Sequence, residues 1–337
     1  MMRSLQPSQG FSRRRFVGCG AASFAVLPTI AKAQGTPLRQ GMPLTLPDAQ
    51  QNAQPDASKI AADTDAAQHL TINVMINGKG PFQFVVDTGA DRSVVAQDVA
   101  VSLGLLRGTH VNVEGIVRTV NAETVTVDNL TFGAVSRDHL ILPVLPRTLL
   151  GSDGYLGLDA IDGYRVTLDF QNRALLVGQP HHVMLMNWLP PQETMVPVHG
   201  SMGHLRATNC KVDGVNTTAF IDTGAEISVA NVKLFNELVA INPAYIRKET
   251  VALTGVTGGL VQGRLATIER VKLGGLRWEI CNLVVADLQI FDIWGLGDRP
   301  ALLIGMNFLR QFAKVSVDYG SHELRFDLAS LRVAQRT

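Results

Sequence analysis

Apolar and polar positions alternate along most of the chain from about residue 69 onward. Residues 70–76 place an apolar side chain at every second position, which predicts a half-buried strand, and residues 82–86 return after a tight turn. Helical spacing is confined to short stretches such as residues 96–105 and 232–239. Many short strands with few helices predict an all-β fold of closed or sandwiched antiparallel sheets. Other strand-like runs lie at residues 111–113, 124–127, 205–212, 217–221, 250–253 and 267–273.

This pattern occurs twice. Asp-Thr-Gly-Ala stands at residues 87–90 and again at residues 222–225, each time directly after an apolar run. His69 lies as far before the first copy as His204 lies before the second. A second pair of similar blocks follows in the same order, at residues 154–159 with 165–170 and at residues 302–307 with 314–319. We therefore expect an internal duplication of one folding unit.

The length of 337 residues favours two domains. Hydrophobic residues make up 46% of the chain and charged residues 18%, which is typical of a folded globular protein. Residues 34–66 are polar and lack apolar periodicity, so they predict a flexible linker, with a propeptide that masks the site as the alternative. The expected divisions are a signal peptide at 1–33, that linker, a first lobe at 67–180, an inter-lobe linker at 181–193 and a second lobe at 194–330.

The first 33 residues have the features of an export signal. Three arginines at 13–15 precede a modestly apolar run at 19–30, and Ala31-Lys32-Ala33 offers a cleavage site. Paired arginines followed by Phe and Val favour the twin-arginine route over an ordinary secretory signal. The apolar run falls short of the ~20 residues that span a bilayer. We expect a periplasmic or secreted protein without stable membrane insertion after cleavage.

Charge and cysteine content exclude further classes of function. A net charge of +1 gives no basic surface of the kind that binds nucleic acid. After the signal, Cys210 and Cys281 remain; they form either a disulfide or two buried thiols. No Cys and His spacing predicts a metal site, so no metal and no cofactor is expected.

The repeated Asp-Thr-Gly-Ala turn carries the candidate chemistry. Two carboxyl groups held close together share one proton, because both cannot ionise at once, and the pair then supplies an acid and a base. Asp87 and Asp222 are the candidates for such a dyad. A single Asp-Thr-Gly is equally well explained as a simple turn. Two copies, each after an apolar strand where a lone carboxylate would be costly, favour the dyad.

These motifs resemble those of the retropepsin-type aspartic proteases. The similarity rests on the two Asp-Thr-Gly-Ala turns, the later apolar-apolar-Gly blocks and the run Gly305-Met306-Asn307-Phe308-Leu309. Together with the export signal it resembles bacterial periplasmic members with two such units in tandem. The resemblance implies a bilobal acid-protease fold, aspartic endopeptidase activity on a peptide or protein substrate, and a monomer that needs no partner to complete its site.

The resemblance also implies roles for the residues that follow the dyad. Gly89 and Gly224 would allow a tight turn beside the carboxyl groups. Thr88 and Thr223 would hydrogen bond across the lobe interface. Ala90 and Ala225 stand where pepsin-like relatives often carry Ser, so activity is expected nearer neutral pH than pH 4.

Substrate-binding candidates lie on two glycine-containing segments and beside the motifs. Gly255, Gly258 and Gly259 predict a hairpin flap in the second lobe, with an ordinary long hairpin as the alternative. The first lobe has Gly115 alone at the equivalent place, which predicts two unequal flaps. Asp91 and Glu226 follow the two motifs, either as substrate-binding acids or as solvated acids on a turn.

The sequence leaves two alternative functions to consider. A non-catalytic peptide-binding protein with this fold would show the same motifs, although two intact Asp-Thr-Gly turns favour the enzyme. A hydrolase with a Ser or Cys nucleophile is disfavoured, because the chain lacks the corresponding motifs. His69 and His204 are interpreted as structural.

Overall fold

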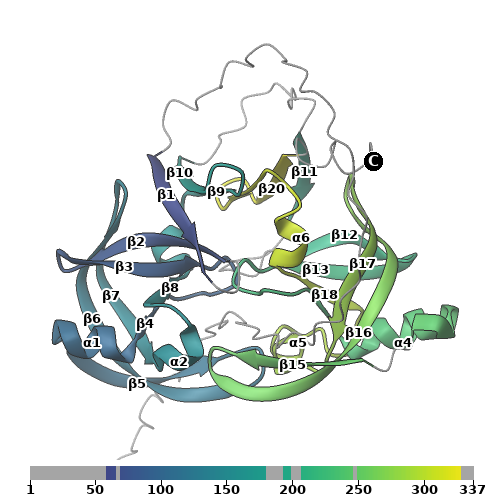
Figure 1. Cartoon of the computed structure of the whole chain (residues 1–337), viewed down its shortest axis with the longest axis horizontal. Helices are drawn as coiled ribbons and strands as arrows, with labels where there is room; N and C mark the ends of the chain where they lie inside the picture. Colours follow the sequence, from purple (N-terminus) through teal and green to yellow (C-terminus); the bar gives the residue numbers. More distant parts are fainter. Residues whose placement is uncertain (1–57, 66–68, 180–192, 199–205, 246–248, 328–337) are drawn as a thin grey trace, which may run out of the picture.

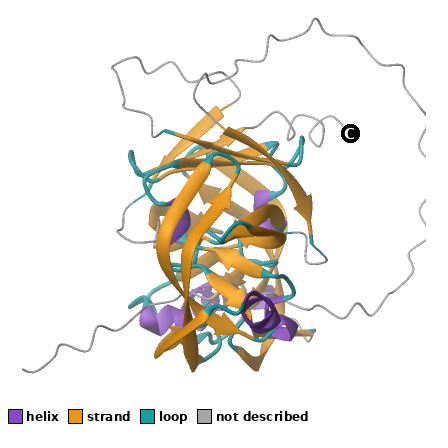
Figure 2. Ribbon diagram, turned by 90° about the vertical axis from the view of Figure 1, so that its left-hand side faces the viewer, coloured by secondary structure: helices purple, strands orange, loops and turns teal. Residues whose placement is uncertain are grey.

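The computed structural model describes residues 58–65, 69–179, 193–198, 206–245 and 249–327, which form two β-rich lobes and a sheet shared between them (Figure 1). Strands make up most of this part of the chain, and the helices are short (Figure 2). The prediction of an all-β, bilobal fold is confirmed. The predicted signal peptide lies outside the described residues.

The first lobe is a closed sheet with the strand order β2-β3-β8-β4-β7-β6-β5. Pairing of β2 with β6, at Ile76 and Leu130, closes it. Its strands are β2 (Leu70–Ile76), β3 (Lys79–Val86), β4 (Val94–Ala96), β5 (Leu106–Glu114), β6 (Thr119–Phe132), β7 (Val135–Leu145) and β8 (Gly154–Leu156). Its helices are α1 (Gln97–Leu103), α2 (Arg147–Leu150) and α3 (Leu158–Ile161).

The second lobe repeats this topology as β12-β13-β18-β14-β17-β16-β15, closed by pairing of β12 with β16. The equivalent strand order in both lobes shows the duplication that the repeated motifs predict. Its strands are β12 (Arg206–Val212), β13 (Val215–Ile221), β14 (Val229–Ala230), β15 (Thr250–Gly255), β16 (Gly258–Leu273), β17 (Leu276–Val285) and β18 (Ala301–Ile304). Its helical segments are α4 (Val232–Ile241), η1 (Pro243–Tyr245), α5 (Gln289–Ile293) and α6 (Met306–Leu309).

A third group of strands joins the lobes, in the order β11-β20-β19-β9-β10-β1. Both halves of the chain contribute to it, and the central pair, β9 with β19, crosses from one half to the other. A hydrogen bond of 2.7 Å between the hydroxyls of Thr167 and Ser316 links the same two strands. The strands are β1 (Ser58–Thr64), β9 (Arg165–Asp169), β10 (Ala174–Gly178), β11 (Glu193–Pro197), β19 (Lys314–Asp318) and β20 (Glu323–Asp327).

The shared sheet corrects two predicted boundaries. Residues 58–64 were expected to belong to a flexible linker, but they form β1, which pairs with β10 and then with β2. Likewise, Glu193 begins β11 instead of ending the inter-lobe linker. Pairing with distant strands orders these two segments. Their own sequences carry little apolar periodicity, so the sequence alone does not predict that they are strands.

The hairpin turns follow from residues that tolerate a positive φ. Asn77 and Gly78 have φ of 50° and 71°, and Asp213 and Gly214 have φ of 43° and 92°. Such pairs match the right-handed twist of the flanking strands. The equivalent hairpins β2–β3 and β12–β13 each lead into one of the repeated Asp-Thr-Gly-Ala turns.

The two predicted helices begin and end close to the predicted residues. Helix α1 stops where Gly104 takes φ of 63° and its N–H donates to the carbonyl of Val101 at 3.0 Å. Helix α4 begins where the Asn231 side chain accepts a hydrogen bond from the N–H of Leu234 at 2.9 Å. It runs on to Ile241, beyond the predicted end at residue 239.

Both cysteines left after the predicted signal are free and buried, so the structure favours the thiol alternative over a disulfide. Burial raises the pKa of Cys210 to about 12. Among the described helices, none combines the length and apolar character needed to cross a bilayer.

Candidate active site

The two repeated turns meet between the lobes. Asp87 directly follows β3 and Asp222 directly follows β13, and the backbone N–H of each donates to the neighbouring parallel strand, at Leu156 (2.9 Å) and Ile304 (3.0 Å). Asp87 is 0% exposed and Asp222 is 4% exposed. The strands thus deliver two buried carboxyl groups to the same interface.

Each carboxyl group is oriented by its own turn. The N–H of Gly89 donates to Oδ1 of Asp87 at 2.8 Å, and the N–H of Gly224 donates to Oδ1 of Asp222 at 2.9 Å. A Cβ atom added to Gly89 would lie 2.8 Å from Cγ of Asp222, so only glycine leaves room for the opposing carboxyl group. The carboxyl groups of Asp87 and Asp222 also hydrogen bond to each other, which contributes to the raised pKa of Asp87 and opposes the rise in the pKa of Asp222.

The threonines of the two motifs exchange hydrogen bonds across the interface. Oγ1 of Thr223 accepts from the N–H of Thr88 at 3.0 Å and donates to the carbonyl of Val86 at 2.7 Å. In the other direction, Oγ1 of Thr88 accepts from the N–H of Thr223 at 3.3 Å and donates to the carbonyl of Ile221 at 3.4 Å. These bonds fix the spacing of the two turns, and with it the spacing of the carboxyl groups.

Burial raises the pKa values of both carboxyl groups. The pKa of Asp87 lies well above its usual range because of desolvation, to which the nearby charge of Asp222 adds. Desolvation also raises the pKa of Asp222, to about 6, against the opposing effects of the Gly224 N–H and of the charge on His69. The pair therefore favours a single shared proton over a wide pH range.

A hydrogen-bonded support that the sequence analysis missed lies behind each turn. The N–H and hydroxyl of Ser93 donate to Oδ1 of Asp159 at 2.8 and 2.6 Å, and the N–H of Gly157 donates to the Ser93 hydroxyl at 3.0 Å. Ser228 makes the same bonds to Asn307, at 2.9 and 2.7 Å, and accepts from Gly305 at 3.0 Å. Asp159 and Asn307 occupy equal places in the repeated blocks, which was the available signal.

Ala90 and Ala225 are buried, and their carbonyls join the turns to these supports. The Ala90 carbonyl accepts from the N–H of Leu158 at 2.9 Å, and the Ala225 carbonyl accepts from the N–H of Met306 at 2.7 Å. Their methyl side chains supply no hydroxyl donor beside the dyad. The turns therefore lack one group that would favour the ionised form.

The acids after the two motifs are partly buried, unlike freely solvated turn residues. Burial raises the pKa of Asp91 to about 7, with Arg92 opposing the shift and Asp159 and Glu114 adding to it. Burial also raises the pKa of Glu226, and the charges of His69 and Arg310 oppose that shift. Both acids thus lie among other charged side chains.

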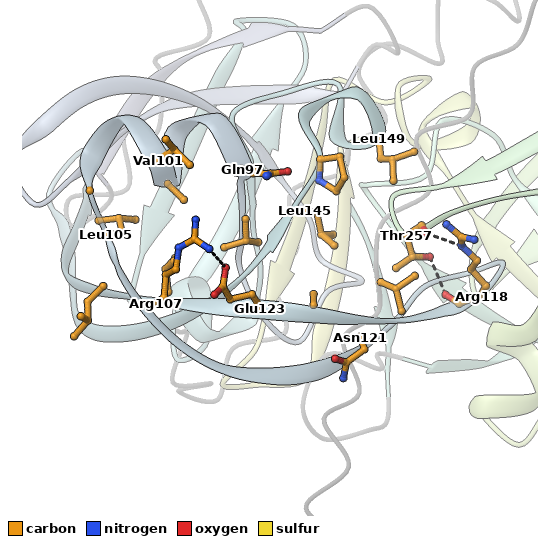
Figure 3. A pocket seen from close by; sticks show the side chains of 18 residues that line it. Gln97, Val101, Leu105, Arg107, Arg118, Asn121, Glu123, Leu145, Leu149 and Thr257 are labelled. Atoms are coloured by element: carbon orange, nitrogen blue, oxygen red, sulfur yellow. Dashed lines mark hydrogen bonds and ion pairs between the residues drawn. The ribbon is translucent and has the colours of Figure 1, made fainter.

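The two predicted flaps are hairpins whose tips touch. Gly115 and Arg118 close the β5–β6 turn through a hydrogen bond of 3.0 Å, and Thr257 lies in the tight turn between β15 and β16. Nε of Arg118 donates to the Thr257 carbonyl at 2.8 Å, and the Thr257 hydroxyl donates to the Arg118 carbonyl at 2.8 Å (Figure 3). We call this contact the flap junction.

Glycines make the flap junction possible. An added Cβ on Gly115 would collide with the Thr257 side chain, and one on Gly258 would lie 2.6 Å from Nη2 of Arg118. Gly259 (φ 88°) packs against Val117 and Arg118 in the same way, and Gly255 lies against Ile116. All four candidate flap glycines therefore face the opposite hairpin or its tip.

The first flap also rests on the second lobe, beside α5. The side-chain amide of Gln289 donates to the Thr119 hydroxyl at 2.8 Å, and the N–H of Ile290 donates to the Ile116 carbonyl at 3.4 Å. These bonds extend the contact between lobes beyond the flap junction.

A pocket of about 830 Å³ extends from the flap junction into the first lobe (Figure 3). Arg118 and Thr257 border one end, and Arg107, paired with Glu123 at 3.1 Å, borders the other. Much of the lining is apolar, with Val120, Leu145 and Leu149 among its residues. The pocket is large enough for a bulky apolar side chain.

Of the two histidines that recur in the repeats, His204 falls outside the described residues, whereas His69 is buried and its Nδ1 pairs with Asp65. Within the described residues, no group of three or more His, Cys, Asp or Glu side chains forms a possible metal site.

Comparison with known proteins agrees with this geometry. A profile of a family described as aspartyl protease matches residues 72–160 and 208–308, one stretch in each lobe. No curated protein matches the chain. Each matched stretch contains one Asp-Thr-Gly-Ala turn, so the two matches correspond to the two repeats. The chain therefore belongs to the aspartyl protease family.

Proposed function

We propose that the protein is an aspartic endopeptidase that cleaves peptide bonds with water activated between Asp87 and Asp222. The observation that carries the proposal is the meeting of two buried carboxyl groups, one from each lobe, whose pKa values are both raised. A pair in this state holds one proton and one negative charge, which are the acid and the base that hydrolysis requires.

The two carboxyl groups alone can supply and accept every proton that moves during hydrolysis. The ionised carboxylate takes a proton from water as the water oxygen bonds to the substrate carbonyl carbon. The protonated carboxyl group gives its proton to the carbonyl oxygen, which yields a tetrahedral diol. The carboxyl group that took the water proton then gives it to the amide nitrogen while the other carboxylate takes a proton from the diol. The C–N bond breaks, an amine and a carboxylic acid leave, and the pair again holds one proton.

The substrate we propose is an extended peptide segment held beneath the two flaps. Backbone groups of the flap strands would pair with it as an added strand, which gives affinity without strict sequence preference. The pocket beside the flap junction favours a large apolar side chain on the first-lobe side of the cleft. No second protomer is needed, because one chain supplies both carboxyl groups.

A peptide library tests the proposal. The mature chain is compared with Asp87→Asn, Asp222→Asn and, as a control, Tyr245→Phe, which removes a hydrogen bond to Asp213 at the opposite end of β13 from Asp222. Cleavage by the parent and the control, with loss in both Asn variants, supports the proposal. Equal cleavage by an Asn variant contradicts it. Peptides that bind but stay intact in every variant favour the non-catalytic peptide-binding protein.

We also propose that the protein acts outside the cytoplasm, in the periplasm or as a secreted protein, after removal of residues 1–33. The arginines at 13–15 and the Ala31-Lys32-Ala33 site support this proposal. N-terminal sequencing of the protein recovered from an expressing bacterium tests it. A start near Gln34 in the exported fraction supports export, and an intact N-terminus confined to the cytoplasm contradicts it.

A further inference from the structure

The side chain at the tip of the first flap is buried in the second lobe. Ile116 is 1% exposed, and it belongs to an apolar cluster whose other buried members, among the described residues, all come from the second lobe. A Cβ added to Gly255 would lie 3.0 Å from Cγ1 of Ile116, which places the isoleucine against the opposite hairpin. The carbonyl of Ile116 accepts from the N–H of Ile290 at 3.4 Å. The isoleucine side chain is therefore inserted into the lobe opposite its own.

Strand registers show which parts of the two lobes are equivalent around this cluster. Val95 and Ala230 stand the same number of residues after the two repeated turns. Val95 pairs with Val144 in β7, and Ala230 pairs with Val285 in β17. Val144 and Val285 are therefore equivalent, and each is soon followed by a short helix, α2 in the first lobe and α5 in the second. The chain after β17 thus has the same place in the second lobe as the chain after β7 has in the first.

This equivalence identifies the cluster as the second-lobe counterpart of the pocket in the first lobe. Leu145 and Leu149 line that pocket of about 830 Å³. By the same count along the second lobe, their equivalents are Ala286 and Ile290, and both belong to the cluster that holds Ile116. We call this part of the cluster, formed by Ala286 and Ile290, the second-lobe seat. The flap of one lobe therefore fills the position that corresponds to an open pocket in the other.

The second-lobe seat adjoins the proposed site. Ala225, from the second Asp-Thr-Gly-Ala turn, is a buried member of the same cluster, so the cluster extends from the dyad to the flap. The flap junction and the hydrogen bond of 2.8 Å from Gln289 to Thr119 hold the chain that follows Ile116 against the second lobe. Ile116 thus covers apolar surface that a substrate side chain under the flaps would otherwise contact.

We propose that Ile116 is a built-in occupant of the second-lobe seat, and that the protein selects peptides with an apolar side chain able to take its place. The inference rests on the proposed function, because the seat belongs to the same cleft. The first-lobe pocket accepts a side chain without such an exchange, whereas the second-lobe seat is vacated only when the first flap withdraws Ile116. A peptide with glycine at that position gains nothing from the seat and leaves Ile116 in it.

The exchange makes Ile116 a determinant of specificity. Moving a buried isoleucine into water is unfavourable, and an incoming apolar side chain recovers a similar free energy. In the parent these two effects nearly cancel, so an apolar residue in the peptide adds little affinity. In Ile116→Ala the outgoing side chain is one methyl group, so the peptide keeps most of what its own burial contributes.

The test is the dissociation constant of paired peptides, measured in the Asp222→Asn background so that no peptide is cleaved. Each pair derives from one cleaved library peptide and carries Leu or Gly at a position next to the cleaved bond, on either side in turn. At the position that reaches the second-lobe seat, Ile116→Ala should bind the leucine peptide about tenfold more tightly and the glycine peptide equally well. Ile116→Val, which removes a single methyl group, should tighten the leucine peptide by about threefold.

Thr257→Val is the matched control for a flap that is merely looser. It breaks one hydrogen bond of the flap junction but keeps Ile116, so it should change the binding of the leucine and glycine peptides by the same factor. The ratio of the two dissociation constants therefore separates an emptied seat from an easier opening of the flaps.

A flap residue that only covers the bound substrate predicts weaker binding of the leucine peptide in Ile116→Ala. That result, or an unchanged ratio at both positions, overturns the inference. If the parent cleaves no library peptide, the proposed function fails separately. Titration with N-acetyl-leucine methylamide, followed by the ¹³C-labelled Cδ1 methyl of Ile290, then decides the inference. A shift at lower concentration in Ile116→Ala than in the parent supports it, and equal shifts, or none in either protein, overturn it.

Discussion

Arg118 of the first lobe and Thr257 of the second exchange two hydrogen bonds, each of 2.8 Å, across the mouth of the site. One uses the guanidinium Nε and the other uses the threonine hydroxyl, and both end on backbone carbonyls. The flap junction is thus a specific contact between two hairpins that are far apart in the sequence. We expect this contact to open before a folded or looped substrate enters the proposed site.

Loss of the threonine hydroxyl should loosen the flaps. Thr257→Val keeps the shape of the side chain but removes one hydrogen bond, worth about 1 kcal/mol. Hydrogen exchange of a peptide that covers residues 112–121 should become about fivefold faster, because opening becomes more frequent. Thr267→Val in β16, the strand that follows this turn, also loses a side-chain hydrogen bond and should leave this exchange unchanged. Equal exchange in the Thr257 variant and the parent would argue against the junction.

A methyl group at Gly258 should impair closure. The added Cβ would lie 2.6 Å from Nη2 of Arg118 at a φ of 77°, so the guanidinium has to move and its hydrogen bond to the Thr257 carbonyl is weakened. We expect kcat/KM to fall by about tenfold, the effect of about 1.4 kcal/mol. Gly214→Ala is the matched control, because its φ of 92° gives similar backbone strain with no neighbour within 4 Å. A similar loss of kcat/KM in both variants would refute a specific role of Gly258.

The cross-lobe threonines should contribute to stability as well as to geometry. Thr223→Val removes the acceptor for the buried N–H of Thr88 and the donor to Val86. An unsatisfied buried N–H costs about 2 kcal/mol, which urea unfolding can detect. Thr223→Ser retains the hydroxyl and should recover most of this loss. Two variants with the same unfolding midpoint would contradict the assigned hydrogen bonds.

The dyad should reduce stability at neutral pH. The folded-state pKa of Asp222, about 6, exceeds its ordinary value of 3.8, so the stability it contributes is present below about pH 4 and is lost as pH rises through 6. Asp222→Asn should therefore gain stability relative to the parent between pH 4 and pH 7.5, by about 3 kcal/mol. Urea unfolding at both pH values measures this. A gain that is equal at pH 4 and pH 7.5 would contradict the raised pKa.

The same pKa values predict that kcat/KM reaches its maximum above the strongly acidic pH range. The base must be ionised and the acid protonated, so the acid limb of kcat/KM should lie near pH 6. Ala90 and Ala225 predict the same shift of activity toward neutral pH from the sequence alone. A maximum rate below pH 4 would contradict both arguments.

The repeated motifs predicted the lobes because the duplication preserves local strand patterns and turn residues. Asn77-Gly78 and Asp213-Gly214 each specify a hairpin without help from distant residues. The shared sheet was missed because β1 becomes a strand by pairing with β10, more than a hundred residues later. Its single well-buried apolar side chain, Ile60, gives no period to read.

Contacts between the lobes could not be predicted from the sequence either. The pairing of Arg118 with Thr257 depends on how two closed sheets are placed against each other. The threonine exchange across the interface followed only from the family resemblance. The supports formed by Ser93 with Asp159 and by Ser228 with Asn307 were accessible in principle, since the serines and their partners recur at equivalent positions.

The most direct test of the central claim is kcat for one cleaved peptide in the parent, Asp87→Asn and Asp222→Asn. Both variants keep the size of the side chain and the acceptor for the turn N–H, so the fold and peptide binding should persist. We predict that kcat falls by about a thousandfold in each variant, as expected for loss of an acid or a base. Retention of more than about a tenth of the parent rate by either variant would contradict a dyad in which both carboxyl groups act.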